Sequence, residues 1–111
     1  MFKSLNDTIP AGTTEIWYQT KSTWENVSFR SSPEFSLATL EDTHIHLGSI
    51  NLERKEDVFR AMQGENWSPE GEARDLIEDK GLVHTSMSVN DIIKIGNRAW
   101  RVASFGFKEI K

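Results

Sequence analysis

The sequence contains no cysteine in its 111 residues. Without cysteine the chain can form neither disulfides nor thiolate metal sites, which excludes a secreted scaffold held together by disulfides and suits a reducing cytosol. Long apolar runs are also missing. Ile16-Trp17-Tyr18 is typical of those present, whereas a membrane-spanning helix needs about 20 apolar residues. The letters MFKSLNDTIPAG hold no apolar segment of signal-peptide length. We expect a soluble, cytoplasmic protein with no membrane partner.

Positive charge is scarce, because 13 Lys and Arg face 17 Asp and Glu and give a formal net charge of −4. This balance argues against a broad phosphate-binding surface. The hydrophobic fraction of 37% is typical of a globular chain, and the length fits one core. We predict a single domain over residues 1–111. Residues 1–12 form its lead-in, frayed or ordered only on docking, because Pro10 and Gly12 lie among polar neighbours.

The first half of the chain favours strands. Residues 14–20 are aromatic and β-branched, residues 21–23 read as a turn, and residues 24–30 alternate so that Val27 and Phe29 share a face. Residues 34–42 fit either a strand or a short helix, and we favour the strand. Residues 42–52 alternate again, with Ile45 and Leu47 opposite His44 and His46.

The period changes to that of a helix after residue 52. Val58, Phe59 and Met62 fall at helical spacing in residues 53–63, and Gly64 follows where a capping glycine belongs. Ser68 and Pro69 are typical of a helix start, so we predict a second helix over residues 69–80 that ends at Gly81.

The last stretch predicts a β-hairpin. Residues 91–95 and 98–103 are strand-forming runs separated by Gly96-Asn97, and a further short strand follows through Phe105 and Phe107. We therefore predict an α+β fold, a curled, mostly antiparallel sheet with two short helices inserted before the C-terminal hairpin. The predicted core comprises Ile16, Val27, Phe29, Ile45, Leu47, Phe59, Leu76, Ile77, Val89, Ile92, Trp100 and Val102.

The segment HTSMSVNDIIKI resembles a C-terminal cassette of the form S-[LM]-S-V-[GS]-D-[IV]-[IV], which is followed by an aromatic-containing strand and a terminal G-F. Small proteins of bacteriophages and other mobile elements carry it, including the YodL-like group. The matching residues are Ser86, Met87, Ser88, Val89, Asp91, Ile92, Ile93, Trp100, Val102, Gly106 and Phe107. Asn90 replaces the usual small residue, which is a mild change because asparagine also tolerates turns. The resemblance covers roughly residues 62–107. It implies a mobile-element setting and a small α+β domain, with no reaction attached.

Two groups of residues raise the question of chemistry. Ser86, Ser88 and Asp91 beside His84 suggest a Ser-His-Asp system, but sequence proximity supplies no such geometry, and we interpret the serines and Asp91 as turn and capping residues. His44 and His46 form an H-x-H pair that could bind metal with a third ligand such as Asp42 or His84, although a solvated strand face explains them more simply. We therefore expect neither enzymatic activity nor a cofactor.

Binding is the remaining class of function. Trp67 either fixes the second helix to the core or stands exposed as an interface anchor. With it we take His84, Met87, Glu72 and Asp75 as candidate partner contacts. Lys94, Arg98 and Arg101 near Trp100 are the nucleic-acid candidates. The hypothesis is a non-enzymatic accessory protein that binds a host or phage protein in the host cytoplasm. The alternative is a nucleic-acid binder that uses the last hairpin.

Overall fold

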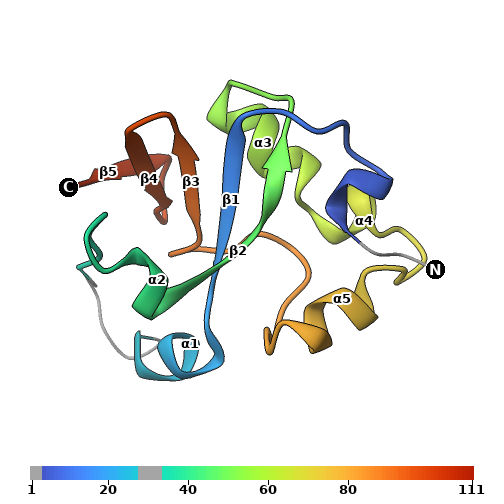
Figure 1. Cartoon of the computed structure of the whole chain (residues 1–111), viewed down its shortest axis with the longest axis horizontal. Helices are drawn as coiled ribbons and strands as arrows, with labels where there is room; N and C mark the ends of the chain where they lie inside the picture. Colours follow the sequence, from blue (N-terminus) through green and yellow to red (C-terminus); the bar gives the residue numbers. More distant parts are fainter. Residues whose placement is uncertain (1–3, 28–33) are drawn as a thin grey trace.

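Strands from both halves of the chain pair into one sheet in the computed structural model, which describes residues 4–27 and 34–111, and the backbone alone of Val27. The sheet is open and antiparallel, with the order β2-β1-β3-β4-β5 (Figure 1). The strands are β1 (Thr14–Gln19), β2 (His44–Ile50), β3 (Ile92–Ile95), β4 (Arg98–Val102) and β5 (Phe107–Ile110). The α+β prediction and the C-terminal hairpin are confirmed. The further strand, predicted through Phe105 and Phe107, begins only at Phe107.

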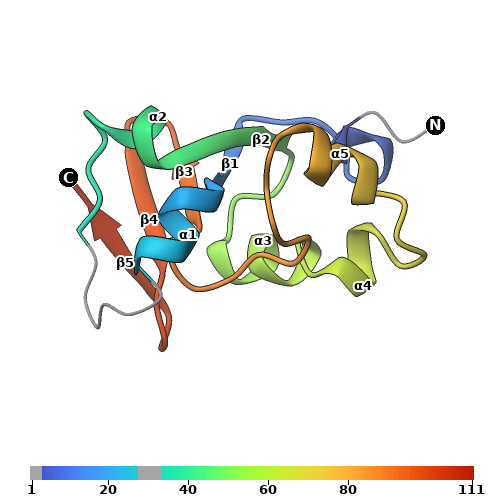
Figure 2. The same cartoon turned by 90° about the horizontal axis from the view of Figure 1, so that it is seen from below.

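Short helices cover this sheet. They are the 3-10 helix η1 (Leu5–Asp7), α1 (Lys21–Val27), α2 (Leu40–Thr43), α3 (Lys55–Ala61), α4 (Gly64–Trp67) and α5 (Arg74–Asp79). Figure 1 shows α4 and α5 beyond β2, with α1 and α2 below the strands, and Figure 2 shows α2 and α3 on opposite sides of the sheet.

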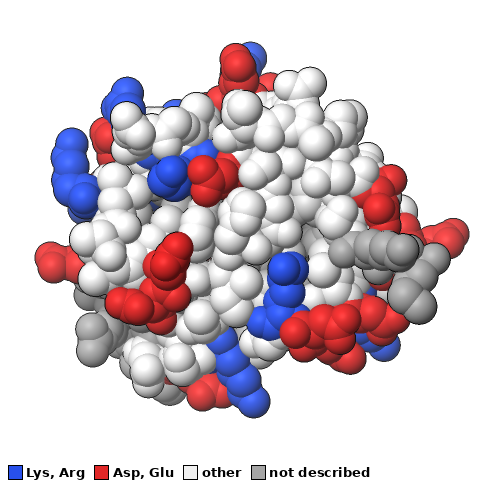
Figure 3. All heavy atoms as spheres, in the orientation of Figure 1, with Lys and Arg blue, Asp and Glu red and all other residues white. Residues whose placement is uncertain are grey.

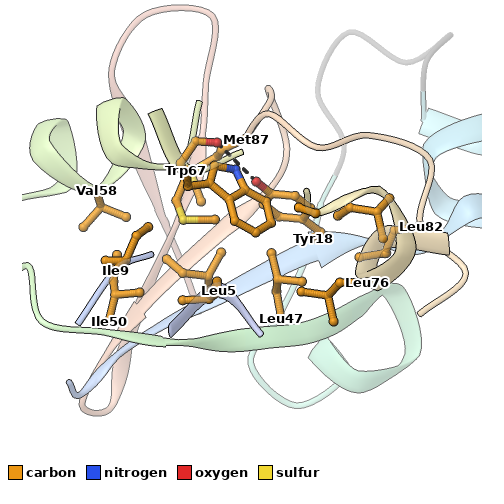
Figure 4. Packing of buried hydrophobic residues seen from close by; sticks show 14 of the residues in the cluster. Leu5, Ile9, Tyr18, Leu47, Ile50, Val58, Trp67, Leu76, Leu82 and Met87 are labelled. Atoms are coloured by element: carbon orange, nitrogen blue, oxygen red, sulfur yellow. Dashed lines mark hydrogen bonds between the residues drawn. The ribbon is translucent and has the colours of Figure 1, made fainter. Parts of the chain in front are cut away.

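The larger core lies on the face that carries α3, α4 and α5. Ile16, Tyr18 and Ile93 of the central strands pack there against the apolar sides of these helices. Trp67 is fully buried in the middle of this cluster, close to Met87, Leu5 and Tyr18 (Figure 4). Its indole N–H donates to the carbonyl of Thr85 at 3.2 Å. Trp67 is therefore a core residue, which confirms the first of the two predicted alternatives and excludes the exposed interface anchor.

A smaller core covers the opposite face. Ile92, Ala99 and Ile110 pack there against Leu40 of α2, with Phe35 and Leu37 alongside. This second layer explains why the alternation in β2 does not separate a buried from an exposed face. His44 is buried although it was predicted on the polar face, and the register shifts between Ile16 and Trp17.

The lead-in is part of the fold from Ser4 onward. The Ser4 hydroxyl accepts from the Asn6 N–H, and the Asn6 side chain donates to the Ser49 carbonyl at 2.9 Å. Leu5 and Ile9 are buried in the larger core, and a Cβ at Gly48 would lie 2.8 Å from Leu5 Cδ2. The frayed lead-in is thus wrong for residues 4–12.

Two predicted strands of the first half are wrong. Residues 21–27 are the helix α1, which the Thr20 hydroxyl caps by accepting from the Thr23 N–H at 3.2 Å. Residues 28–30 of that predicted strand lie outside the described part. Residues 34–39 form no strand, because the Ser36 hydroxyl accepts from the Thr39 N–H in a turn that leads into α2.

The helical region is broken more often than predicted. Gly64 does not cap α3 but begins α4, and α5 starts at Arg74 because Gly71, with φ of 79°, turns the chain first. Ser68 still caps that turn by accepting from the Ala73 N–H. Gly81 ends α5 as predicted, with φ of 71°.

Half of the predicted core is confirmed by the burial of Ile16, Leu47, Leu76, Ile77, Ile92 and Val102. The other six residues fall into three kinds. Val89 is 44% exposed, while Ile45, Phe59 and Trp100 are half-buried. Phe29 and the side chain of Val27 lie outside what the structure describes. None of the described helices has the length and apolar character needed to cross a membrane.

Replacing Leu5 by alanine tests the role of the N-terminal segment. Because Leu5 is fully buried against Gly48, we expect Leu5→Ala to lower the free energy of unfolding by about 3 kcal/mol. Urea titration measures this, with the exposed Thr13→Ala as control. A loss equal to that of the control would show that the segment docks without supporting the core.

Candidate functional site

A buried carboxylate organises the cassette around residues 84–91. Asp91 is fully buried, and its Oδ1 accepts from the Gln19 N–H at 3.0 Å. Its Oδ2 accepts from the Ser88 N–H at 2.8 Å and lies 2.6 Å from His84 Nε2. Because the partner of Nε2 is a carboxylate oxygen, His84 carries hydrogen on this nitrogen. The Asp91 carboxylate thus joins the end of β1, the turn before β3 and the loop that carries His84.

Aromatic rings enclose the imidazole of His84. The Tyr18 ring stacks on it at 4.6 Å between centroids and the Trp24 ring of α1 lies at 4.4 Å, so that the side chain is only 10% exposed. Burial, with a further contribution from the charge of Asp91, raises the pKa of Tyr18 well above its ordinary value. Tyr18 therefore stays protonated and donates to the Thr85 carbonyl at 2.7 Å.

The serines of this segment are not placed for nucleophilic catalysis. Ser86 Oγ accepts from the Gly64 N–H at 2.7 Å, and Ser88 Oγ donates to the Ser86 carbonyl at 3.0 Å. His84 Nδ1, the nitrogen that would have to activate a nucleophile, is buried with no hydrogen-bond partner. The described residues thus give His84 and Asp91 a structural pairing without the third member of a triad.

The H-x-H pair is divided between two environments. His44 donates from Nε2 to the Asn90 carbonyl at 2.8 Å and accepts at Nδ1 from the Thr43 hydroxyl at 2.8 Å, so neither nitrogen is left for a metal. His46 is exposed and lies beside Trp17 and Glu15. Within residues 4–27 and 34–111 no group of three or more His, Asp or Glu side chains could hold a metal ion.

The sequence-predicted partner contacts do not form one surface. Trp67 and Met87 are buried and His84 is nearly so, which removes all three from a surface that a protein could touch. Glu72 and Asp75 are exposed beside and on α5, where acidic side chains gather (Figure 3).

The three nucleic-acid candidates are divided as well. Lys94 and Arg101 share one sheet face, whereas Arg98 points to the other. Lys94 forms an ion pair with Glu15 at 3.3 Å. Arg98 binds Glu109 through two hydrogen bonds of 2.9 Å, which raises the pKa of Arg98 and lowers that of Glu109. These cations are thus not a basic patch, and of the three only Arg101 has no ion pair among the described residues.

Phe105, the most exposed apolar residue of the described part, was not among the residues predicted to contact a partner. It lies in the turn between β4 and β5 and is 95% exposed. The turn closes by a 2.9 Å bond from the Ala103 N–H to the Gly106 carbonyl, with Gly106 at φ of 70°. The available signal was Gly106, since a glycine between two strand-forming runs marks a hairpin connection and places Phe105 just before it in the turn.

A groove adjoins this turn. It has a volume of about 480 Å³ and lies between α3 and the β4–β5 turn, lined by Glu56, Phe59, Arg60, Gln63, Val102, Ala103, Ser104, Gly106 and Phe107. Phe59 and Phe107 meet edge to face in it, with centroids 6.5 Å apart. We call Phe105 together with this groove the Phe105 surface. It combines a protruding aromatic residue with an aromatic-lined hollow.

Comparisons with protein-family models, with curated proteins and with solved structures gave no match for the chain.

The Asp91 carboxylate gives a stability prediction. In Asp91→Asn an amide NH₂ replaces one oxygen and faces N–H donors, so we expect the free energy of unfolding to fall by about 3 kcal/mol. Urea titration of this variant and of the exposed control Asp75→Asn measures the effect. A loss of under about 1 kcal/mol would mean that the three donors find other acceptors.

His44 gives a pH prediction. Burial lowers its pKa below the ordinary 6.5, and the hydrogen bond to Asn90 and the charge of Asp91 oppose this less strongly. The unfolded chain then takes up a proton at higher pH than the folded chain. The stability that neutral His44 contributes is therefore fully present above about pH 6.5 and is lost as the pH falls through the lowered value.

Unfolding free energies between about pH 7 and pH 5 check this. The slope should be smaller in His44→Gln than in the unaltered protein and unchanged in the exposed control His46→Gln. Equal slopes in all three proteins would contradict the assignment to His44.

Proposed function

We propose that the protein is a non-enzymatic protein-binding module and that the Phe105 surface contacts its partner. The observation that carries the proposal is the 95% exposure of Phe105. The transfer of a phenylalanine side chain from water to a buried site is favourable by on the order of 2 kcal/mol of free energy. An aromatic residue held at the tip of a hairpin buries that area when it enters a partner's pocket.

The rigidity of the turn supports the proposal. The turn that holds Phe105 joins two paired strands, with Val102 of β4 opposite Phe107 of β5 in the register. Gly106 takes a backbone conformation that favours glycine. A side chain presented from such a turn loses little conformational freedom on binding, which favours affinity.

The groove beside the turn supports a protein ligand in particular. Its walls combine the rings of Phe59 and Phe107 with the charged groups Glu56 and Arg60 at the edge. An apolar centre with a polar rim is the usual anatomy of a protein interface. The resemblance of residues 62–107 to mobile-element proteins suggests that the partner is a host or phage protein, met in the host cytoplasm.

Replacing Phe105 by serine tests the proposal. We expect an affinity pull-down from host-cell lysate with the tagged protein to retain a defined protein partner, and Phe105→Ser to lower its recovery at least about tenfold because the anchor is lost. Val83→Ser is the matched control, since Val83 is also an exposed apolar residue, at 45%, and lies in another loop.

Nuclease treatment of a parallel sample distinguishes protein binding from the alternative function, which is nucleic-acid binding. Recovery that survives nuclease and depends on Phe105 supports protein binding. Recovery that is lost with nuclease supports nucleic-acid binding instead. A partner that Phe105→Ser retains as fully as Val83→Ser would place the interface elsewhere and contradict the role of Phe105.

A further inference from the structure

Two cations face each other on the last hairpin, and neither has a counter-ion among the described residues. Arg101 of β4 lies directly opposite Lys108 of β5, so their side chains share one sheet face. Like charges in directly opposed positions destabilise a strand pair. Neither residue makes an ion pair with a described residue. The chain as a whole has a net charge of −4, so two neighbouring cations without an ion pair in the described part are unexpected.

The neighbouring acidic residue does not balance them. Glu109 lies next to Lys108 in β5, but it is opposite Trp100 and therefore on the other face of the sheet. Both of its carboxylate oxygens are taken by Arg98. Figure 3 shows acidic side chains gathered over α5, whereas basic and acidic side chains are mixed over the last three strands.

A second groove lies at these cations. It has a volume of about 370 Å³ and is lined by Glu34, Phe35, Arg101, Lys108, Glu109, Ile110 and Lys111. Lys111 adds a third cation, which makes no ion pair in the described part although its charge adds to the effect of the Arg98 hydrogen bonds in lowering the pKa of Glu109. Glu34 and Glu109 are the two acids of the lining. The groove has an apolar floor in Phe35 and Ile110, both of which belong to the smaller core.

In the described part of the chain, the edge of β5 that is turned away from β4 is not paired with another strand. Within the described part of the chain, β5 pairs with β4 alone. Ala103 bonds to Gly106, so hydrogen-bonded pairs recur at Arg101–Lys108 and at Ala99–Ile110. The N–H and C=O groups of Phe107 and Glu109 then point away from β4. These are the groups that an added strand would bind.

We infer that the β5 edge binds an extended, acidic segment of a partner protein as a sixth strand of the sheet. Every second side chain of that strand lies on the face of Arg101 and Lys108, where a carboxylate offsets the paired cations. The intervening side chains lie on the opposite face, beside Phe107. A polypeptide fits this site better than a nucleic acid, because three cations on an acidic protein offer little to a phosphate chain.

The inference rests on the proposed function in one respect, which is that the ligand is a polypeptide. The two sites can nevertheless be separated, because Phe105→Ser leaves the β5 edge and its cations in place. A defined peptide therefore tests this site whether or not a cellular partner uses Phe105.

The probe is a fluorescent peptide of about eight residues that alternates valine and glutamate, long enough to match a typical strand. Fluorescence anisotropy compares it with a valine–serine peptide and with a single-stranded oligothymidine. We expect only the glutamate peptide to bind, with an affinity that falls as salt is added. Arg101→Gln/Lys108→Gln should weaken it at least about tenfold.

The matched control is Arg74→Gln/Lys80→Gln, which removes two cations at α5, away from the groove. It should bind the peptide as the unaltered protein does. Hydrogen exchange followed by NMR supplies a second measurement, because ionic attraction alone would not change the exchange rates of backbone amides in β5. Peptide binding should slow exchange at the amides of Phe107 and Glu109, because strand addition engages them.

Each other result overturns the inference. Binding of the glutamate peptide without protection of these amides would show ionic attraction and no added strand. An equal loss in both double variants would show a response to net charge. Tighter binding of oligothymidine would assign the cations to nucleic acid, and binding of none of the probes would leave the edge without a ligand of this class.

Discussion

One buried carboxylate supports the architecture. Asp91 joins the N–H of Gln19 at the end of β1, which is 72 residues away in the sequence, to the N–H of Ser88 and the imidazole of His84 in its own segment. A charge removed from water is stable only with such donors around it, so the two segments must arrive together. The Ser86 hydroxyl extends the arrangement to the first amide of α4. Residues 84–91, which carry these groups, thereby link the helical region to the sheet through hydrogen bonds.

The period of the sequence predicted those parts of the fold in which one face is buried and the other is solvated. α3 follows this rule, whereas β1 and the C-terminal hairpin were predicted from their aromatic and β-branched residues and from the Gly96-Asn97 turn. The bounds of all these elements were predicted to within a few residues. The rule fails where both faces of the sheet are covered, as at His44, whose burial beside Phe35 depends on the second layer. It also fails at α1, because the cap at Thr20 decides that segment against its alternating pattern.

The candidate site was harder to predict, for a different reason. The interpretation of Ser86, Ser88 and Asp91 as turn and capping residues agrees with their hydrogen bonds, since these interactions are local. Trp67 and Met87 were taken as possible contacts, yet their burial depends on Leu5 and Tyr18 from distant segments. Phe105 was expected to continue a strand, and only the register that opposes Val102 to Phe107 shows that it occupies the turn.

The order of the strands has a consequence for how the chain folds during its synthesis. β1 begins at Thr14, but one of its two sheet neighbours, β3, begins at Ile92. While the chain emerges from the ribosome, β1 can pair only with β2. The other edge of β1 stays unpaired until β3 has been synthesised. Pairings between such distant segments form slowly and leave unpaired strand edges exposed to other chains. The interval before β3 arrives is therefore the stage at which this protein is most prone to aggregate.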